Sequence, residues 1–261
     1  MSNLPADLQT RLKAAIAHFW TCRGSQADAQ GGAEGDKDRG SRAAVTGGKH
    51  LDGFLGLIAA LLEEAGLQRS HIYWKEKTAL PGWFRAEKDW DFLVVADGKL
   101  VAILEFKSQV GSFGNNFNNR AEETIGSATD LWESYEHGAF ALSSAPWLGY
   151  LMWMEDSPKV KTAVKVQEPH FKVFPEFKGA SYQERYNQLM TRLVRKRLYN
   201  ACCLLLSQQG SATGEYTEPN PELGFTPFVA SLFAKAVAIA QMQPPGPPAP
   251  PTIERGPIPK A

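Results

Sequence analysis

The sequence has few cysteines, no excess of either charge and no long apolar run. Its 261 residues include three cysteines, two of them adjacent at Cys202 and Cys203, which excludes a disulfide framework and indicates a reducing compartment. No run reaches the roughly 18 apolar residues of a membrane span, and the charged N-terminus lacks the apolar core of a signal peptide. We therefore expect a cytoplasmic protein that is neither exported by a signal peptide nor embedded in a membrane.

The balance of charge limits what composition says about partners. The 28 basic and 28 acidic residues give a formal net charge of +0, so composition does not indicate a strongly basic nucleic-acid-binding protein. A local basic cleft is compatible with this balance. The motifs must therefore indicate the function.

The length favours one elaborated domain, which we expect to span residues 1–242. Within it, residues 22–48 are rich in glycine and charge and poor in large apolar side chains, so we expect a mobile loop there. That loop is either simply solvated or becomes ordered when basic residues such as Arg42 meet a phosphate backbone. Residues 243–261 are too rich in proline to pack and are expected to form a disordered tail.

Apolar residues recur at helical or strand spacing over most of the domain. Helices are predicted at Pro5–Trp20, Lys49–Glu64, Arg120–His137, Ser181–Leu198 and Thr226–Met242. Strands are predicted around His71–Lys75, in a hairpin over Lys88–Lys107 and at Trp147–Glu155. This order predicts an α/β fold with a mixed central β-sheet flanked by helices.

The predicted hairpin, WDFLVVADGKLVAILEFKSQ, carries Asp91, Glu105 and Lys107 within two strongly apolar strands. A two-residue Asp-Gly loop would place Asp91 opposite Leu104, on the other face of the sheet from Glu105. A three-residue loop with a bulge would instead place Asp91 opposite Ile103, so that all three charges share one face. A common site for the three residues requires the second register.

Hydrolysis of a phosphodiester bond is a chemical reason to bring these charges together. Magnesium prefers oxygen ligands and is commonly held by one or two carboxylates together with substrate phosphate oxygens. Asp91 and Glu105 would supply the carboxylates, the backbone carbonyl of Phe106 a further ligand, and Lys107 would orient or activate the attacking water. The alternative is an ion-pair cluster at an exposed strand end.

The arrangement resembles the PD-(D/E)xK nucleases, which share an α-β-β-β-α-β core. Trp90 here precedes Asp91 where that superfamily has proline. Longer stretches resemble the XhoI-type restriction endonucleases: RAAVTGGKHLDGF, LPGWFRAEKDWDFLVV, LEFKSQVGSFGNNFNNRAEE, PWLGYL and EPHFKVFPEFKGASYQERY. The resemblance implies that Asp91 and Glu105 are the metal carboxylates and that Lys107 is the catalytic lysine.

The resemblance also implies a type II enzyme that uses Mg²⁺ and cuts double-stranded DNA at CTCGAG, after the first C, leaving four-base 5′ overhangs. A palindromic target implies a two-fold homodimer. A restriction-modification system further implies a DNA methyltransferase that protects the same site, with no need for physical contact between the two proteins.

A fourth acid from the first core helix often assists in this superfamily, and Asp52 is the candidate here. Its position at the start of a predicted helix equally suits an acid that is simply stabilised by the helix dipole. Glu63 and Glu64 are the next candidates.

Residues 108–119 are rich in glycine and asparagine and are predicted to form a loop that contacts DNA. Amide side chains pair with adenine edges and arginine with guanine, although asparagine also favours turns and helix caps. The predicted DNA-binding residues are Asn115, Asn116, Asn118, Asn119, Arg120, Arg42, Lys49, Arg192 and Arg195. Of these, Arg192 and Arg195 would bind phosphates or merely solvate a helix face.

Two other functions use the same scaffold. A repair or resolving nuclease would read DNA structure rather than CTCGAG, and a catalytically silent relative would bind DNA without cutting it. The presence of Asp91, Glu105 and Lys107 together argues against the silent protein.

Overall fold

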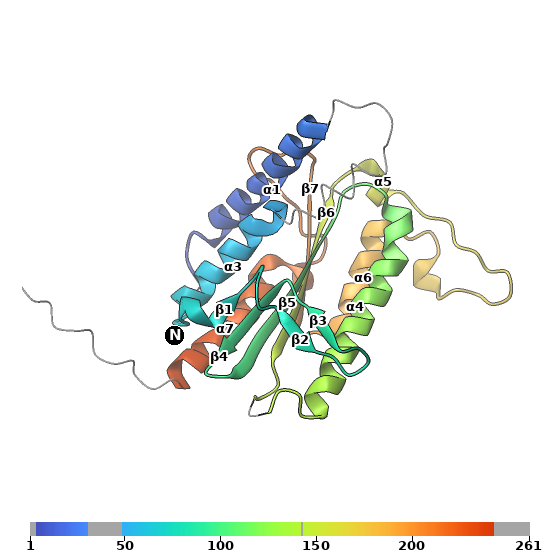
Figure 1. Cartoon of the computed structure of the whole chain (residues 1–261). Coiled ribbons are helices and arrows are strands. Elements are labelled where there is room, and N and C mark those ends of the chain that lie inside the picture. The colour runs from blue at the N-terminus through green and yellow to red at the C-terminus, as the bar shows by residue number, and fades with distance from the viewer. Residues whose placement is uncertain (1–3, 31–48, 142, 243–261) are drawn as a thin grey trace, which may run out of the picture.

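The computed structural model describes residues 4–30, 49–141 and 143–242, and it places a mixed five-stranded sheet between two layers of helices (Figure 1). The strand order is β1-β4-β5-β6-β7, with β1, β4 and β5 antiparallel and β5, β6 and β7 parallel. These strands are β1 (Ile72–Tyr73), β4 (Phe92–Ala96), β5 (Lys99–Gln109), β6 (Trp147–Glu155) and β7 (Ala201–Ser207). The predicted α/β class with a mixed central sheet is therefore confirmed.

Both faces of the sheet are covered, because the central strands alternate large apolar side chains between two cores. In β6, Leu151 and Trp153 face one core while Tyr150 and Met152 face the other. The first core is closed by α1 (Leu8–Gln30), α3 (Asp52–Glu64) and α7 (Phe225–Met242). The second is closed by α4 (Phe113–Glu136) and α6 (Tyr182–Arg195), which lie on the opposite side in Figure 1.

Smaller elements complete the described chain. A separate two-stranded sheet pairs β2 (Ala79–Pro81) with β3 (Glu87–Asp89). The short helices are α5 (Pro158–Lys161) and the 3-10 turns η1 (Lys49–Leu51), η2 (Arg69–His71), η3 (Pro175–Phe177) and η4 (Pro221–Leu223).

Two predicted loops are wrong in part. Helix α1 continues to Gln30, so residues 22–30 are helical, while the rest of the predicted mobile loop, residues 31–48 with Arg42, lies outside the described residues. Helix α4 begins at Phe113 rather than at Arg120, because Phe113 and Phe117, one helical turn apart, are buried in the second core. Packing outweighs the low helix propensity of the intervening asparagines. The predicted tail, residues 243–261, also lies outside the described residues.

One strand of the sheet was absent from the predicted order. Strand β7 pairs in parallel with β6, and its adjacent Cys202 and Cys203 point to opposite cores. Both are free thiols whose pKa burial raises. A short apolar run such as ACCLLLS fits a buried strand and a buried helical turn equally well, which explains the omission.

Helix α7 is long and apolar enough to cross a membrane by length and composition alone. It nevertheless buries one face, including Phe225, Phe228 and Leu232, against the first core, and it contacts β5, β6 and β7. Core helices of soluble proteins pass the same test.

The β4–β5 hairpin follows neither predicted register. The turn has two residues, Asp97 and Gly98, both at positive φ (51° and 72°), as in a type I′ turn. A bulge follows at Val101, because Val95 pairs with Leu100 but Val94 pairs with Ala102. The loop thus has the first of the two predicted lengths, and an extra residue at Val101, rather than a longer loop, places Asp91, Glu105 and Lys107 on the face beneath α4.

Candidate active site

Asp91, Glu105 and Lys107 come together at the start of β4, which Asp91 directly precedes. The Lys107 ammonium contacts an oxygen of Glu105 and lies 3.6 Å from Asp91 Oδ2. The Phe106 N–H donates to the same Asp91 oxygen at 2.7 Å. This bond fixes Asp91, which directly precedes β4: the strand begins at Phe92, so the Asp91 side chain rather than a β4 backbone group accepts from Phe106. The fold therefore brings the three predicted residues into one cluster.

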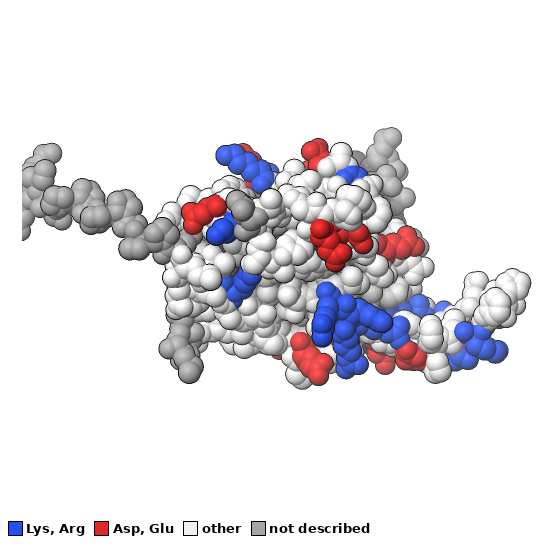
Figure 2. Space-filling view, turned by 90° about the horizontal axis from the view of Figure 1, so that it is seen from below, with Lys and Arg blue, Asp and Glu red and all other residues white. Residues whose placement is uncertain are grey.

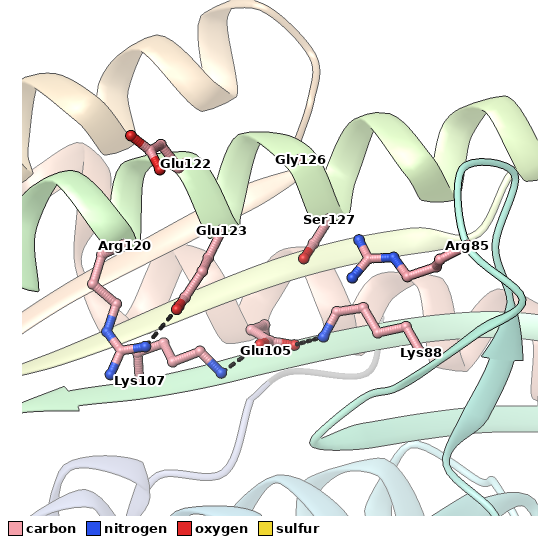
Figure 3. A pocket seen from close by; sticks show the side chains of 9 residues that line it. All are labelled: Arg85, Lys88, Glu105, Lys107, Arg120, Glu122, Glu123, Gly126 and Ser127. Carbon is pink, nitrogen blue, oxygen red and sulfur yellow. Dashed lines mark hydrogen bonds and ion pairs between the residues drawn. The ribbon is translucent and has the colours of Figure 1, made fainter.

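A second lysine, which the sequence did not single out, belongs to this cluster. Lys88 of β3 places its Nζ 3.2 Å from Glu105 Oε2 and 4.4 Å from the centre of the Trp90 ring. Only 14% of its side chain and 8% of that of Glu105 are exposed. Glu105 thus lies between two ammonium groups, one at each oxygen, as Figure 3 shows.

The cluster forms part of a polar pocket of about 430 Å³ between β5, the β2–β3 hairpin and α4 (Figure 3). Its lining is almost entirely charged: Arg85, Lys88, Glu105, Lys107, Arg120, Glu122, Glu123, Gly126 and Ser127. Arg120 pairs with Glu123 at 2.7 Å, while its Nε is buried with no hydrogen-bond partner. An unpaired guanidinium donor beside Lys107 suits a tetrahedral oxyanion better than an apolar ligand.

Like charges crowd the carboxylates. Burial and the nearby negative charge of Glu105 raise the pKa of Asp91, although Lys107 and the Phe106 N–H partly oppose this. Burial alone would lower the pKa of Lys107, but the carboxylates of Glu105 and Asp91 raise it overall. The lysine therefore stays charged and remains paired with both carboxylates.

The oxygen atoms here fit a hard divalent cation. In an extended strand the N–H and C=O of one residue point to the same side, so the carbonyl of Phe106 faces the side of β5 on which Asp91 lies. Two carboxylates and a carbonyl are ligands that Mg²⁺ accepts, with water or substrate oxygens completing its octahedron. A cation between Asp91 and Glu105 would also relieve their repulsion.

The sequence matches the family model described as restriction endonuclease XhoI over residues 30–218, which include the whole of this site. The chain belongs to the XhoI restriction endonuclease family. It is 49% identical over 213 residues to the type II restriction enzyme BstVI of Geobacillus stearothermophilus, covering 79% of this chain and 95% of that one.

Two further relatives agree with this assignment. The type II restriction enzyme XhoI of Xanthomonas vasicola is 43% identical over 197 residues, covering 73% of this chain and 77% of its own. AbrI of Azospirillum brasilense, also a type II restriction enzyme, is 44% identical over 169 residues, covering 64% and 75%. No solved structure matches the chain. This XhoI-family protein is a type II restriction endonuclease, a phosphodiester hydrolase that acts on double-stranded DNA.

Asp52 does not join the site of the XhoI-family chain. It pairs with Lys75 at 2.8 Å on the side of the sheet that faces the first core. Glu63 pairs with Arg69, and Glu64 pairs with Arg11. Among the described residues, no three His, Cys, Asp or Glu side chains are placed to hold one metal ion. The prediction of an acid from the first core helix is therefore wrong for this geometry.

The fold places the predicted DNA-binding residues in different parts of the molecule. Arg120 lies in the pocket, whereas the four asparagines stand on the first turns of α4, not on a loop. Asn116 donates to the Ser112 carbonyl at 3.2 Å, and Asn118 and Asn119 are exposed. For Asn115 and Lys49 only the backbone is described.

Arg192 and Arg195 lie away from the pocket. Arg192 contacts Glu176 and stacks 5.0 Å from the Phe177 ring centre, and Arg195 is exposed in the last turn of α6. In the view from below, Lys and Arg gather next to Asp and Glu, so this face is not uniformly basic (Figure 2). Contact of Arg192 and Arg195 with DNA remains a prediction.

The β2–β3 hairpin that supplies Lys88 is pinned to α4 by Asp130. This carboxylate, 5% exposed, accepts from the backbone N–H groups of Trp83 (2.8 Å) and Phe84 (2.7 Å) and from Arg85 Nε (2.7 Å). A Cβ on Gly82 would lie 2.7 Å from Asp130 Oδ2, so the turn needs glycine to approach this closely. The pocket wall is therefore rigidly attached to the helix opposite.

We expect Asp130→Asn to destabilise the fold by about 2 kcal/mol at neutral pH, since one acceptor charge serves three donors. Burial alone would raise the Asp130 pKa, but the Phe84 N–H, Arg85 and the Trp83 N–H lower it overall. A depressed folded-state pKa stabilises the fold above the unfolded value of 3.8, and this contribution is lost as the pH falls through the folded-state pKa.

Urea unfolding at pH 7 and in acid measures this effect, with the exposed Glu136→Gln of the same helix as the matched control. The difference between Asp130→Asn and wild type should shrink as the pH falls below 3.8. A difference that is absent at pH 7, or that grows in acid, would contradict the assigned role.

Proposed function

We propose that this chain cuts double-stranded DNA at CTCGAG, after the first C, and that Asp91, Glu105 and Lys107 carry out the hydrolysis with Mg²⁺. The observation that carries the chemistry is the meeting of two carboxylates and a lysine beside a charged pocket, whose lining includes Glu105 and Lys107. Membership of the XhoI family supports CTCGAG as the target, because the relative from Xanthomonas vasicola is itself named XhoI.

Each residue has a distinct task in this proposal. Asp91, Glu105 and the Phe106 carbonyl hold Mg²⁺, which when bound polarises the phosphoryl oxygen and lowers the pKa of bound water. Lys107, held by both carboxylates, orients the attacking water and stabilises the charge that develops on the phosphorus oxygens. Arg120, whose guanidinium lines the pocket, binds the phosphate rather than a base edge.

The assembly and setting follow from the target. Two copies related by a two-fold axis would place one site on each strand of the palindrome, so we propose a homodimer. Cuts after the first C on both strands leave four-base 5′ overhangs. A DNA methyltransferase that modifies the same site would protect the host, and both enzymes would act in the cytoplasm.

A digest tests this function directly. Purified protein is incubated with a plasmid bearing one CTCGAG and with a plasmid in which one base of that site is altered. Each is assayed with Mg²⁺ and with EDTA. We expect one linear product, confined to the intact site and to Mg²⁺, and sequencing of its ends should show the 5′ overhangs.

The other outcomes separate the alternatives. Cutting of branched DNA without regard to CTCGAG would indicate a structure-specific nuclease. Retention of duplex DNA with no nicking under any divalent ion would indicate a silent DNA-binding protein. Single cutting at a different palindrome would keep the chemistry and overturn only the target.

A further inference from the structure

We propose that Lys88 is a positioning residue that occupies Glu105 while DNA is absent and so keeps the metal site weak until DNA binds. This inference rests on the proposed function of the site. It concerns the order in which the site is filled, which the three proposed catalytic residues do not determine.

The contacts of Glu105 are the first step. Lys107 contacts Oε1 and Lys88 lies 3.2 Å from Oε2, so an ammonium group sits at each oxygen. Because the Glu105 side chain is only 8% exposed, water competes weakly for these contacts. A metal ion that binds Glu105 must share or displace an ammonium.

The charges of the cluster are the second step. Asp91 and Glu105 contribute two negative charges, and Lys88 and Lys107 contribute two positive charges, so the four groups sum to zero. A divalent cation is attracted to a site with negative charge and is not attracted to a neutral one. Without Lys88 the same site would carry one net negative charge.

The attachment of Lys88 is the third step. Its ammonium lies 4.4 Å from the Trp90 ring centre and donates to the Asp89 carbonyl at 3.1 Å. The hairpin that carries it is fixed through Arg85 to Asp130. A lysine that was only a solvated surface charge would show neither this burial nor these three partners.

DNA offers Lys88 another anion. The pocket wall presents Arg85, Lys88 and Lys107 in addition to Arg120, and a phosphate entering there gives the Lys88 ammonium a competing partner. Glu105 Oε2 is then released for the metal. Metal and DNA should therefore strengthen each other's binding, and by linkage the effect is reciprocal.

The test measures Ca²⁺ affinity by titration calorimetry, with and without a CTCGAG duplex, using Ca²⁺ as a probe that is expected to bind without supporting cutting. Lys88→Gln removes the charge, and Lys88→Arg keeps it. The matched control is Lys75→Gln, which removes the lysine paired with Asp52 on the other side of the sheet. Thermal unfolding verifies that each variant is folded, and Lys88→Met is the second neutral variant.

We expect the DNA-free affinity for Ca²⁺ to rise at least about fivefold in Lys88→Gln, and the gain in affinity caused by DNA to shrink by the same factor. Lys88→Arg and Lys75→Gln should resemble wild type. A merely structural lysine would lower metal affinity when removed, which is the opposite sign. Unchanged or weaker DNA-free binding in the neutral variants would overturn the proposal.

Wild-type protein alone provides an independent test. Equal Ca²⁺ affinity with and without DNA would overturn the proposal even if both neutral variants failed to fold. The DNA-free titration involves neither cutting nor a target sequence. A negative result in the titration would therefore contradict only the role of Lys88, whereas a negative digest would contradict the proposed function.

Discussion

Lys107→Ala should lose about 10³-fold or more in the rate of DNA cutting while it still binds DNA. Its ammonium is the cation that touches both carboxylates of the pair, so it lies where the attacking water and the phosphate must meet. Removing it takes away charge that is needed most in the transition state, and such losses appear in kcat rather than in binding.

Single-turnover cutting of a CTCGAG duplex measures this loss, and a gel-shift assay in Ca²⁺ measures binding. Lys99→Ala is the matched control, because Lys99 is an exposed lysine at the start of the same strand. A Lys107→Ala protein that cut at the wild-type rate would show that the cluster is an ion-pair network and that the active site lies elsewhere.

The cluster was predictable from sequence because its members are near one another along the chain. Strong apolar runs around an Asp-Gly pair predict a hairpin, and a hairpin brings its two free ends together. Of the two loop lengths left open, the shorter one occurs. The bulge at Val101, an internal feature of β5 that no sequence pattern marks, brings the three charges to one face, an arrangement that the sequence predicts only with a longer loop.

The second lysine was not predictable in the same way. Lys88 lies in a three-residue strand of a separate small sheet. Its position over Glu105 depends on the hydrogen bonds that attach the hairpin to Asp130. That contact joins residues 46 and 47 positions apart. No local sequence pattern indicates such a contact, so the position of the β2–β3 hairpin in the pocket wall was not predictable.

The asparagine-rich segment shows a different limit. Its composition suits a loop, and only the burial of Phe113 and Phe117 turns it into the first turns of α4. Tertiary packing decided the outcome, as it commonly does where propensity is weak. The change matters for function, since it directs Arg120 into the pocket from a rigid helix.

Asp91→Asn should abolish cutting, with a loss of about 10³-fold, and yet stabilise the folded protein. Burial and the charge of Glu105 raise the Asp91 pKa, so ionised Asp91 costs stability at neutral pH. The amide keeps the oxygen that accepts from Phe106 N–H. Because 37% of the side chain is exposed, solvent screens the effect, and we expect a gain below about 1 kcal/mol, or up to a few degrees in Tm.

The pH dependence follows from the sign of the shift. An acid whose folded-state pKa is raised destabilises the fold as the pH rises through that pKa, and it has no effect once both states are protonated. The advantage of Asp91→Asn should therefore be present at pH 7 and vanish as the pH falls below the unfolded value of 3.8. Thermal unfolding in EDTA across this range measures it.

Glu105→Gln is the matched comparison, because it removes the same charge from the other carboxylate and should also abolish cutting. Glu105, however, is buried between Lys88 and Lys107, so its loss leaves the Lys88 ammonium without its carboxylate and Lys107 with Asp91 alone. We expect it to destabilise the fold by about 3 kcal/mol. Opposite stability changes with the same loss of cutting would show that Asp91 is held for catalysis at a cost to the fold, whereas Glu105 serves both. If Asp91→Asn were also destabilising, the inferred cost of burying ionised Asp91 beside Glu105 would be wrong.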